Sequence, residues 1–142
     1  MKYTFDVAFL PCEALKKHDA RIVVDLLRAT TQITTFFDMG GEVLVPVTEV
    51  DEAFAMKEKL GEDWKIMGER GGLPAPGFDF GNSPLELQAA GAPEHAIITT
   101  SNGTRAIMRA VKPCAHVTAG CARNAEAAAC DGLWAGASVA LI

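Results

Sequence analysis

The chain has 142 residues, 49% hydrophobic and 22% charged, which is enough for one domain with an apolar core. Its formal net charge is -5, and its Lys and Arg residues do not run together. These properties argue against nucleic acid or an anionic membrane as the main partner. No apolar run has the length of a membrane span, and the first ten residues do not resemble a secretory signal.

The cysteine pattern indicates thiols rather than a metal site or a disulfide framework. No pair has C-x-x-C spacing, and the three histidines are scattered, so a zinc site is not expected. We expect reduced, mostly buried thiols in a cytoplasmic protein. Cys121 lies between a predicted strand and a predicted helix, where a nucleophile could sit, but a buried thiol is the simpler interpretation. The other cysteines are Cys12, Cys114 and Cys130.

In chain order, the first predicted elements alternate between strand and helix. A strand rich in β-branched residues covers 21–25, and a helix follows over 30–39 until Gly40-Gly41 stops it. The next strand covers 42–46. Thr48-Glu-Val-Asp51 resembles a capping box and opens a helix that ends at Leu60.

The second half continues the alternation after a long loop. A strand over 65–68 precedes a loop over 69–82 that is rich in glycine and proline, and a loop this long is usually functional. Ser83-Pro-Leu-Glu86 restarts a helix. The remaining strands are predicted over 96–100, 115–119 and 138–142, with helices over 102–111 and 124–134.

This alternation predicts the fold class. We expect residues 1–142 to form a single α/β domain with three layers, α/β/α, around a mostly parallel or mixed sheet. Ligands of such sheets bind beyond the carboxyl ends of the strands. The polar residues at those ends are therefore the candidates for a functional site.

Three predicted strands end in polar clusters. The first cluster is Asp25-Leu-Leu-Arg-Ala-Thr-Thr31, the second is Glu69-Arg-Gly-Gly72, and the third is Thr100-Ser-Asn-Gly-Thr-Arg105. The third is the best phosphate candidate, because hydroxyls, an amide and a glycine coincide with the start of a helix. The alternative is ordinary capping, since Ser, Thr and Asn occur at helix starts without any ligand.

Each cluster also contains one arginine. Arg28, Arg70 and Arg105 could each bind phosphate or carboxylate oxygens in pairs. Alternatively, each pairs with a nearby acid, and Arg105 faces solvent, where ion pairs contribute little.

Carboxylates in the same region suggest a hard cation. Asp25, Glu69 and Asp79 offer oxygen ligands of the kind that Mg²⁺ prefers, and Mg²⁺ could neutralise phosphate charge and activate water. In the alternative, Asp25 and Asp79 accept hydrogen bonds from loop N–H groups. The sequence contains no P-loop, G-x-S-x-G or H-E-x-x-H motif.

Four segments together resemble the 2-phosphosulfolactate phosphatase family, also called ComB-like. The match covers nearly the whole chain, and the four segments occur in the family's order. They are Val23-Val-Asp-Leu-Leu-Arg-Ala-Thr-Thr31, Gly68-Glu-Arg-Gly71, Gly77-Phe-Asp-Phe-Gly-Asn-Ser-Pro84 and Thr99-Thr-Ser-Asn-Gly-Thr104.

The resemblance implies a Mg²⁺-dependent phosphatase. Members of the family convert 2-phospho-3-sulfolactate to 3-sulfolactate and phosphate, a step toward coenzyme M. Ser101 stands where the family usually has threonine, which keeps the hydroxyl. The chain is little more than half a typical member, so we expect it to be the N-terminal part of a longer protein.

We therefore expect a Mg²⁺-assisted phosphomonoester hydrolase. Asp25, Glu69 and Asp79 would hold or orient the metal, and the catalytic set would be Asp25, Arg28, Glu69 and Arg70, with the arginines offsetting charge in the transition state. Metal-activated water is the expected nucleophile. A phosphoaspartate route through Asp25 is an alternative, although the D-x-D signature is missing. The substrate-binding set would comprise Thr30, Thr31, Asn82, Ser83, Thr100, Ser101, Asn102, Gly103 and Thr104.

Two other functions stay open at this point. One is a phosphatase acting on a different small phospho acid, and the other is a non-catalytic anion-binding module. A half-length chain would also expose a sheet edge or core face, so we expect a homo-oligomer.

Overall fold

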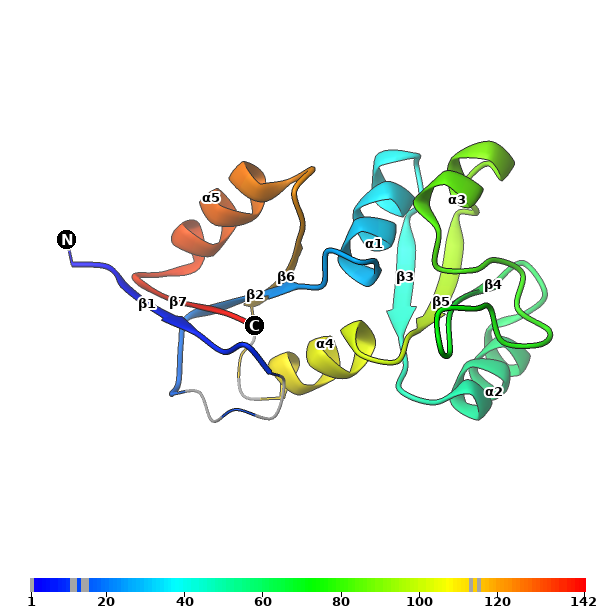
Figure 1. Cartoon of the computed structure of the whole chain (residues 1–142), viewed down its shortest axis with the longest axis horizontal. Helices are drawn as coiled ribbons and strands as arrows, with labels where there is room; N and C mark the ends of the chain where they lie inside the picture. Colours follow the sequence, from blue (N-terminus) through cyan, green and yellow to red (C-terminus); the bar gives the residue numbers. More distant parts are fainter. Residues whose placement is uncertain (1, 11–12, 14–15, 113, 115) are drawn as a thin grey trace.

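The computed structural model describes residues 2–10, 13, 16–112, 114 and 116–142, which leaves Cys12 and the expected first strand residue Ala115 outside the described part. Figure 1 shows the arrangement of its helices and strands. In chain order they are β1 (Thr4–Val7), β2 (Ala20–Val24), α1 (Ala29–Asp38), β3 (Val43–Pro46), α2 (Val50–Leu60), β4 (Lys65–Gly68), α3 (Pro84–Ala90), β5 (His95–Thr99), α4 (Gly103–Val111), β6 (His116–Gly120), α5 (Ala125–Ala135) and β7 (Ser138–Leu141). Within the described residues, no helix has both the length and the apolar character needed to cross a membrane.

The strands form two parallel sheets, which confirms the three-layer α/β fold class. One sheet has the order β1-β7-β2-β6 and the other has the order β3-β5-β4, and all the pairings between these strands are parallel. In Figure 1, α1 and α4 lie between the two sheets, α5 lies on the first sheet, and α2 and α3 accompany the second. The strands of the described part therefore form two separate sheets, and helices α1 and α4 lie between them.

Most predicted elements are confirmed to within a residue at their ends, and two expectations about single elements differ. The expected single sheet is also divided into two. β1 was not expected as a strand, because its side chains are largely exposed and give no buried apolar run. The box that opens α2 is centred on Glu49 and Glu52, one residue later than expected. Glu52 Oε2 accepts the backbone N–H groups of Thr48 and Glu49, at 2.9 and 3.1 Å.

Helices pack on both faces of β2 in the first sheet and of β4 and β5 in the second, which explains the continuous apolar runs of these strands. On β4 and β5, Met67 and Ile98 belong to a core cluster that includes Phe36 of α1. The alternate residues, Ile66 and Ile97, belong to a second cluster that includes Ala53 of α2. The first sheet repeats this arrangement, with Ile22 packed beside Ala128 of α5 and Val23 beside Ala106 of α4.

Gly68 allows β4 and β5 to approach closely at their carboxyl ends. Its φ is +132°, and a Cβ atom there would overlap the backbone carbonyl oxygen of Thr99. The next residue, Glu69, donates its backbone N–H to that same carbonyl at 3.1 Å. Glycine at 68 is therefore required both by the backbone conformation and by the space available.

Comparing alanine substitutions at Gly68 and at a control glycine should separate the requirement for the backbone conformation from the requirement for space. We expect Gly68→Ala to lower the free energy of unfolding by about 3 kcal/mol or more, because strain and overlap add. Gly61→Ala is the matched control: its φ is +113° and the space beside it is open, so we expect a loss of only about 1–2 kcal/mol. Urea denaturation measures both, and equal losses would contradict the close approach.

Candidate functional site

A cavity of about 290 Å³ lies where the carboxyl ends of β2, β4 and β5 meet. It contains residues from all three polar clusters and from the long loop. Its lining consists of Asp25, Leu27, Arg28, Glu69, Gly71, Gly72, Asn82, Ser101 and Asn102. The structure therefore brings together the two expected acids Asp25 and Glu69, the arginine Arg28, and three of the expected substrate-binding residues.

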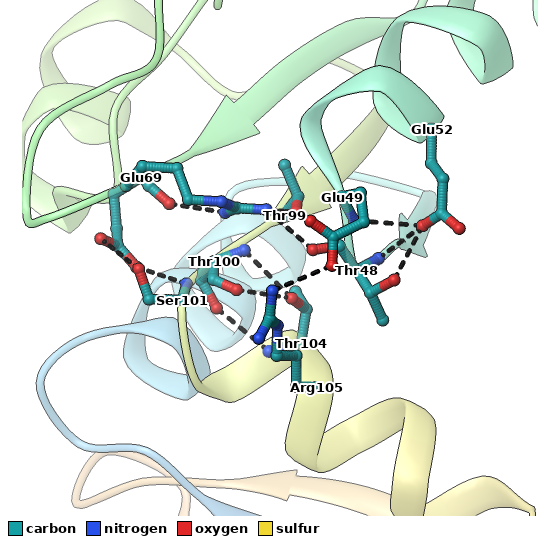
Figure 2. A network of polar contacts seen from close by, with 10 residues as sticks. Thr48, Glu49, Glu52, Glu69, Thr99, Thr100, Ser101, Thr104 and Arg105 are labelled. Carbon is teal, nitrogen blue, oxygen red and sulfur yellow. Dashed lines mark hydrogen bonds and ion pairs between the residues drawn. The ribbon is translucent and has the colours of Figure 1, made fainter.

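Glu69 is the anchor of this cavity and is only 8% exposed. Its Oε1 accepts the backbone N–H of Ser101 at 2.7 Å. Its Oε2 accepts the Ser101 hydroxyl at 3.1 Å and the backbone N–H of Gly72 at 2.8 Å. Figure 2 shows Glu69 facing Ser101 across the ends of two strands. Burial alone would raise the pKa of Glu69, but these hydrogen bonds outweigh it and hold the pKa below its usual value.

Asp25 shows the opposite behaviour. Burial raises the pKa of its carboxyl group, and the negative charge of Glu69 raises it further. Backbone hydrogen bonds from Ala29, Leu27 and Gly103 oppose that rise without cancelling it. Two carboxylates with pKa values moved in opposite directions therefore share one cavity, an arrangement typical of acid–base or metal sites.

The threonines of the first cluster support the backbone. Thr30 is fully buried, and its hydroxyl donates to the Asp25 carbonyl at 2.8 Å and accepts the Asp25 backbone N–H at 3.0 Å. Thr31 donates its hydroxyl to the carbonyl of Leu26 at 2.9 Å. Neither hydroxyl caps α1, which has no side-chain cap bond; both instead bind the backbone of the turn before the helix, and neither residue lines the cavity. Their role in substrate binding stays a prediction.

The third cluster is held by a reciprocal pair of threonines, shown in Figure 2. The backbone N–H of Thr100 donates to the Thr104 hydroxyl, and that of Thr104 donates to the Thr100 hydroxyl, both at 3.0 Å. Both residues are buried. This pair shapes the turn that presents Ser101 and Asn102 to the cavity, while Gly103 packs so closely that a Cβ there would meet Ala29 and the Asp25 carboxylate.

The three arginines differ in their contacts. Arg28 lines the cavity and donates to the carbonyl oxygen of Gly72 at 3.0 Å. Arg70 is directed elsewhere, donating to the carbonyl oxygens of Glu69 and Thr48 and to the Thr99 hydroxyl, at 2.7–2.8 Å. Arg105 forms an exposed ion pair with Glu49 at 2.9 Å, visible in Figure 2.

Asp79 and Ser83 do not line this cavity. Asp79 accepts the backbone N–H of Ile66 at 2.8 Å and pairs with Lys57 at 3.1 Å. Burial opposes these contacts, but together they hold the pKa of Asp79 below its usual value. These are the contacts of the alternative interpretation of Asp79, and its role as a metal ligand stays a prediction. Ser83 is the N-cap residue of α3, without a side-chain cap bond.

The described thiols are free, and two of the three are buried. Cys114 and Cys121 are buried, whereas Cys130 is exposed. The sulfur of Cys121 lies 3.4 Å from the hydroxyl oxygen of Thr34. Burial would raise the pKa of Cys121, but hydrogen bonds from Thr34 and from backbone N–H groups lower it. The expectation of a buried thiol at position 121 is confirmed.

Buried amides near the cavity were only partly anticipated by the sequence. Asn82 was expected in the substrate-binding set, and its buried Oδ1 atom has no hydrogen-bond partner within the part of the chain that the structure describes. Gln32 of α1, which no motif indicated, is fully buried, and the same holds for its Oε1 atom. The only available signal for Gln32 was a polar residue at an interior position of an otherwise apolar helix face.

The amino-acid sequence of this chain matches a known protein family. A family model described as 2-phosphosulpholactate phosphatase matches residues 9–141. A probable 2-phosphosulfolactate phosphatase of Carboxydothermus hydrogenoformans is 43% identical over 126 residues, covering 87% of this chain and 51% of that protein. Those of Thermus thermophilus and Deinococcus radiodurans are 40% and 41% identical, covering 91% and 78% of this chain and 53% and 46% of theirs. The chain thus spans about half the length of these relatives.

The contacts of Asp79 lead to a prediction that separates its two interpretations, as a metal ligand or as an acceptor of backbone hydrogen bonds. A carboxylate with a lowered folded-state pKa stabilises the fold above its unfolded pKa, and this contribution is lost as the pH falls through the folded pKa. We expect Asp79→Asn to cost about 1 kcal/mol at pH 7, because a charge-assisted, partly solvated pair is lost. That difference should disappear in acid. We also expect Mg²⁺ affinity to be unchanged.

Urea denaturation between pH 3 and 7 and Mg²⁺ calorimetry provide the two readouts. Asp63→Asn, at an exposed position, is the control for the loss of one carboxylate. If Asp79→Asn abolished Mg²⁺ binding while Asp63→Asn did not, Asp79 would belong to the metal site after all.

Proposed function

This chain belongs to the 2-phosphosulpholactate phosphatase family, and we propose that it forms the catalytic cavity of a phosphoric monoester hydrolase. The proposed reaction is hydrolysis of 2-phospho-3-sulfolactate to 3-sulfolactate and phosphate, in the cytoplasm and toward coenzyme M. The observation that carries the proposal is the cavity itself, in which Asp25, Glu69 and Arg28 converge at the strand ends.

The donor set of the cavity fits a magnesium ion. Within the described residues, no three His, Cys, Asp or Glu side chains lie close enough together to form a metal cluster, so carboxylates alone do not make the site. However, Asn82 Oδ1 is a buried oxygen without a partner, and Asn82 lines the cavity beside Asp25 and Glu69. Two carboxylates and an amide oxygen are hard donors of the kind Mg²⁺ takes. We propose that these three residues hold Mg²⁺, which would supply charge neutralisation and a lowered pKa of water.

Arg28 is the residue proposed to bind the anionic oxygens of the substrate. It is the one cation among the residues that line the cavity, and its bond to Gly72 uses only part of the five-donor guanidinium group. A phosphate group carries more negative charge than this arginine can offset. Arg28 therefore supports binding together with the proposed metal rather than in place of it.

Asp25 is proposed as the base that accepts a proton from the attacking water. Burial and the charge of Glu69 raise the pKa of Asp25. This rise opposes the lowering that a bound cation would cause, and so favours a carboxyl group that can accept and release a proton during turnover. The water oxygen attacks phosphorus as its proton passes to Asp25, and the bond between phosphorus and the ester oxygen breaks. The leaving oxygen takes up a proton from solvent to form the alcohol, and Asp25 then releases its proton to solvent. A phosphoaspartate route is less favoured, because the sequence lacks the D-x-D signature.

Activity measurements test the proposal directly. We expect the 142-residue chain to release phosphate from 2-phospho-3-sulfolactate in the presence of Mg²⁺, and Asp25→Asn to lower kcat/KM by about 100-fold or more. Glu49→Gln is the control, since Glu49 pairs with Arg105 outside the cavity, and we expect less than about a twofold change for an exposed pair.

The full-length Carboxydothermus protein serves as the positive control for the assay. If that protein turned over substrate and this chain bound phosphate without turnover, the chain would be an anion-binding module. Turnover of other 2-phospho acids at the same rate would contradict the assignment of the sulfonated substrate.

We also propose that the chain self-associates through an apolar groove beside the cavity. The groove, of about 560 Å³, includes Phe9, Leu10, Leu26 and Leu27. Phe9 and Leu27 are 88% and 91% exposed, and a contiguous apolar surface of this kind favours association.

Sedimentation equilibrium measures this association. We expect the chain to form dimers or larger species and Phe9→Glu to shift it toward monomer, because burying the introduced carboxylate is costly. Trp134→Glu is the control: Trp134 is 94% exposed but does not line the groove. A monomeric chain, or equal effects of both variants, would contradict the groove as the interface.

A further inference from the structure

Gln32 is a fully buried polar residue that no role yet explains. It lies on α1 and is fully buried, next to Ile33 and close in sequence to Phe36, both in the apolar core cluster. Its Nε2 group donates to the backbone carbonyl of Gly81 at 3.5 Å, while its Oε1 atom has no partner among the described residues. Burying such an amide is unfavourable unless its contacts serve some purpose.

The orientation of the Gln32 side-chain amide follows from its contact with the carbonyl oxygen of Gly81. The opposite assignment of nitrogen and oxygen would place two oxygens against each other at Gly81, which is repulsive. The NH₂ group must therefore face Gly81.

Gly81 is held at both of its backbone polar groups. Its N–H donates to Glu86 Oε2 at 3.0 Å, and its carbonyl accepts the contact from Gln32. These two contacts restrain the backbone of Gly81, and with it the peptide bond that leads into Asn82. Asn82 is 5% exposed and lines the cavity, and it has the second unpartnered amide oxygen of this region.

We propose that Gln32 is a positioning residue, which holds Gly81 and thereby fixes Asn82 in the wall of the cavity that Asp25 and Glu69 also line. Gln32 does not itself line the cavity, so it acts through Asn82. The inference rests on the proposed function for what Asn82 binds, a hydrated divalent cation. The placement of Asn82 can be tested without that cation.

The first test observes Asn82 directly in the 142-residue protein. Its side-chain NH₂ signals in a ¹⁵N spectrum are assigned by their loss in Asn82→Asp. In the wild-type chain we expect a rigid side chain. In Gln32→Met, which keeps the length of the side chain but cannot hydrogen-bond to Gly81, we expect the heteronuclear NOE of these signals to fall. Gln88→Met, at an exposed glutamine of α3, is the control and should leave the signals unchanged.

The second test measures Mg²⁺ binding by calorimetry. We expect Gln32→Met to weaken Mg²⁺ about tenfold, as is typical when the support of a metal ligand is removed, and Gln88→Met to have no effect. If Gln32→Met does not fold, Gln32→Asn, whose side chain is too short to reach Gly81, takes its place in both tests.

The outcomes separate the two proposals. Unchanged Asn82 signals and unchanged Mg²⁺ affinity in a folded Gln32 variant would overturn the positioning role, whatever its melting temperature. A wild-type chain that binds no Mg²⁺ would contradict the metal in the proposed function, and the NMR result would still decide the role of Gln32.

Discussion

The candidate site depends on the hydrogen bonds that the buried carboxylate of Glu69 accepts. They join the end of β4, the start of the long loop and the turn after β5, with Ser101 lying 32 positions away in the sequence. A buried carboxylate without such donors would be too costly to remain ionised. With them, its pKa is lowered, and the charge becomes a fixed part of the cavity. That charge in turn raises the pKa of Asp25, and the proposed cation would relieve the repulsion between the two acids.

Most hydroxyls of the polar clusters are used to build this cavity rather than to line it. Thr30 closes the turn after β2, and Thr100 and Thr104 close the turn after β5. Arg70 similarly joins the backbone of Thr48 to the end of β5. These side chains form hydrogen bonds with backbone N–H and C=O groups at the strand ends. The strand ends are buried between helices, where water cannot supply those hydrogen bonds. Residues that look like ligands in the sequence can therefore be required by the fold alone.

The sequence was sufficient to predict the helices and strands and the region of the chain that forms the site, because both depend on local patterns. Hydrophobic periodicity and caps located the strands and helices, and the rule for strand ends brought Asp25 and Glu69 together. It was insufficient where the answer depends on the direction of a side chain. Asp79 lies within the glycine-rich loop, and the sequence left open whether it binds metal or backbone N–H groups. Its contacts with Ile66 and Lys57 are known only from the structure. Gln32 has no motif, and only its tertiary contact with Gly81 reveals it. The division into two sheets also depends on long-range packing that periodicity does not encode.

The two sheets contribute different acids to the cavity, so their relative placement sets its geometry. Asp25 follows β2 of the first sheet, whereas Glu69 follows β4 of the second. The helices that bridge the sheets, α1 and α4, meet where Gly103 lies against Ala29 and the Asp25 carboxylate, with no room for a Cβ atom. This contact fixes the first turn of α4 against that of α1, and Ser101 just before it carries the N–H that Glu69 accepts. The separation of the two carboxylates is therefore set by the packing of two helix ends, which explains why a glycine is required at position 103.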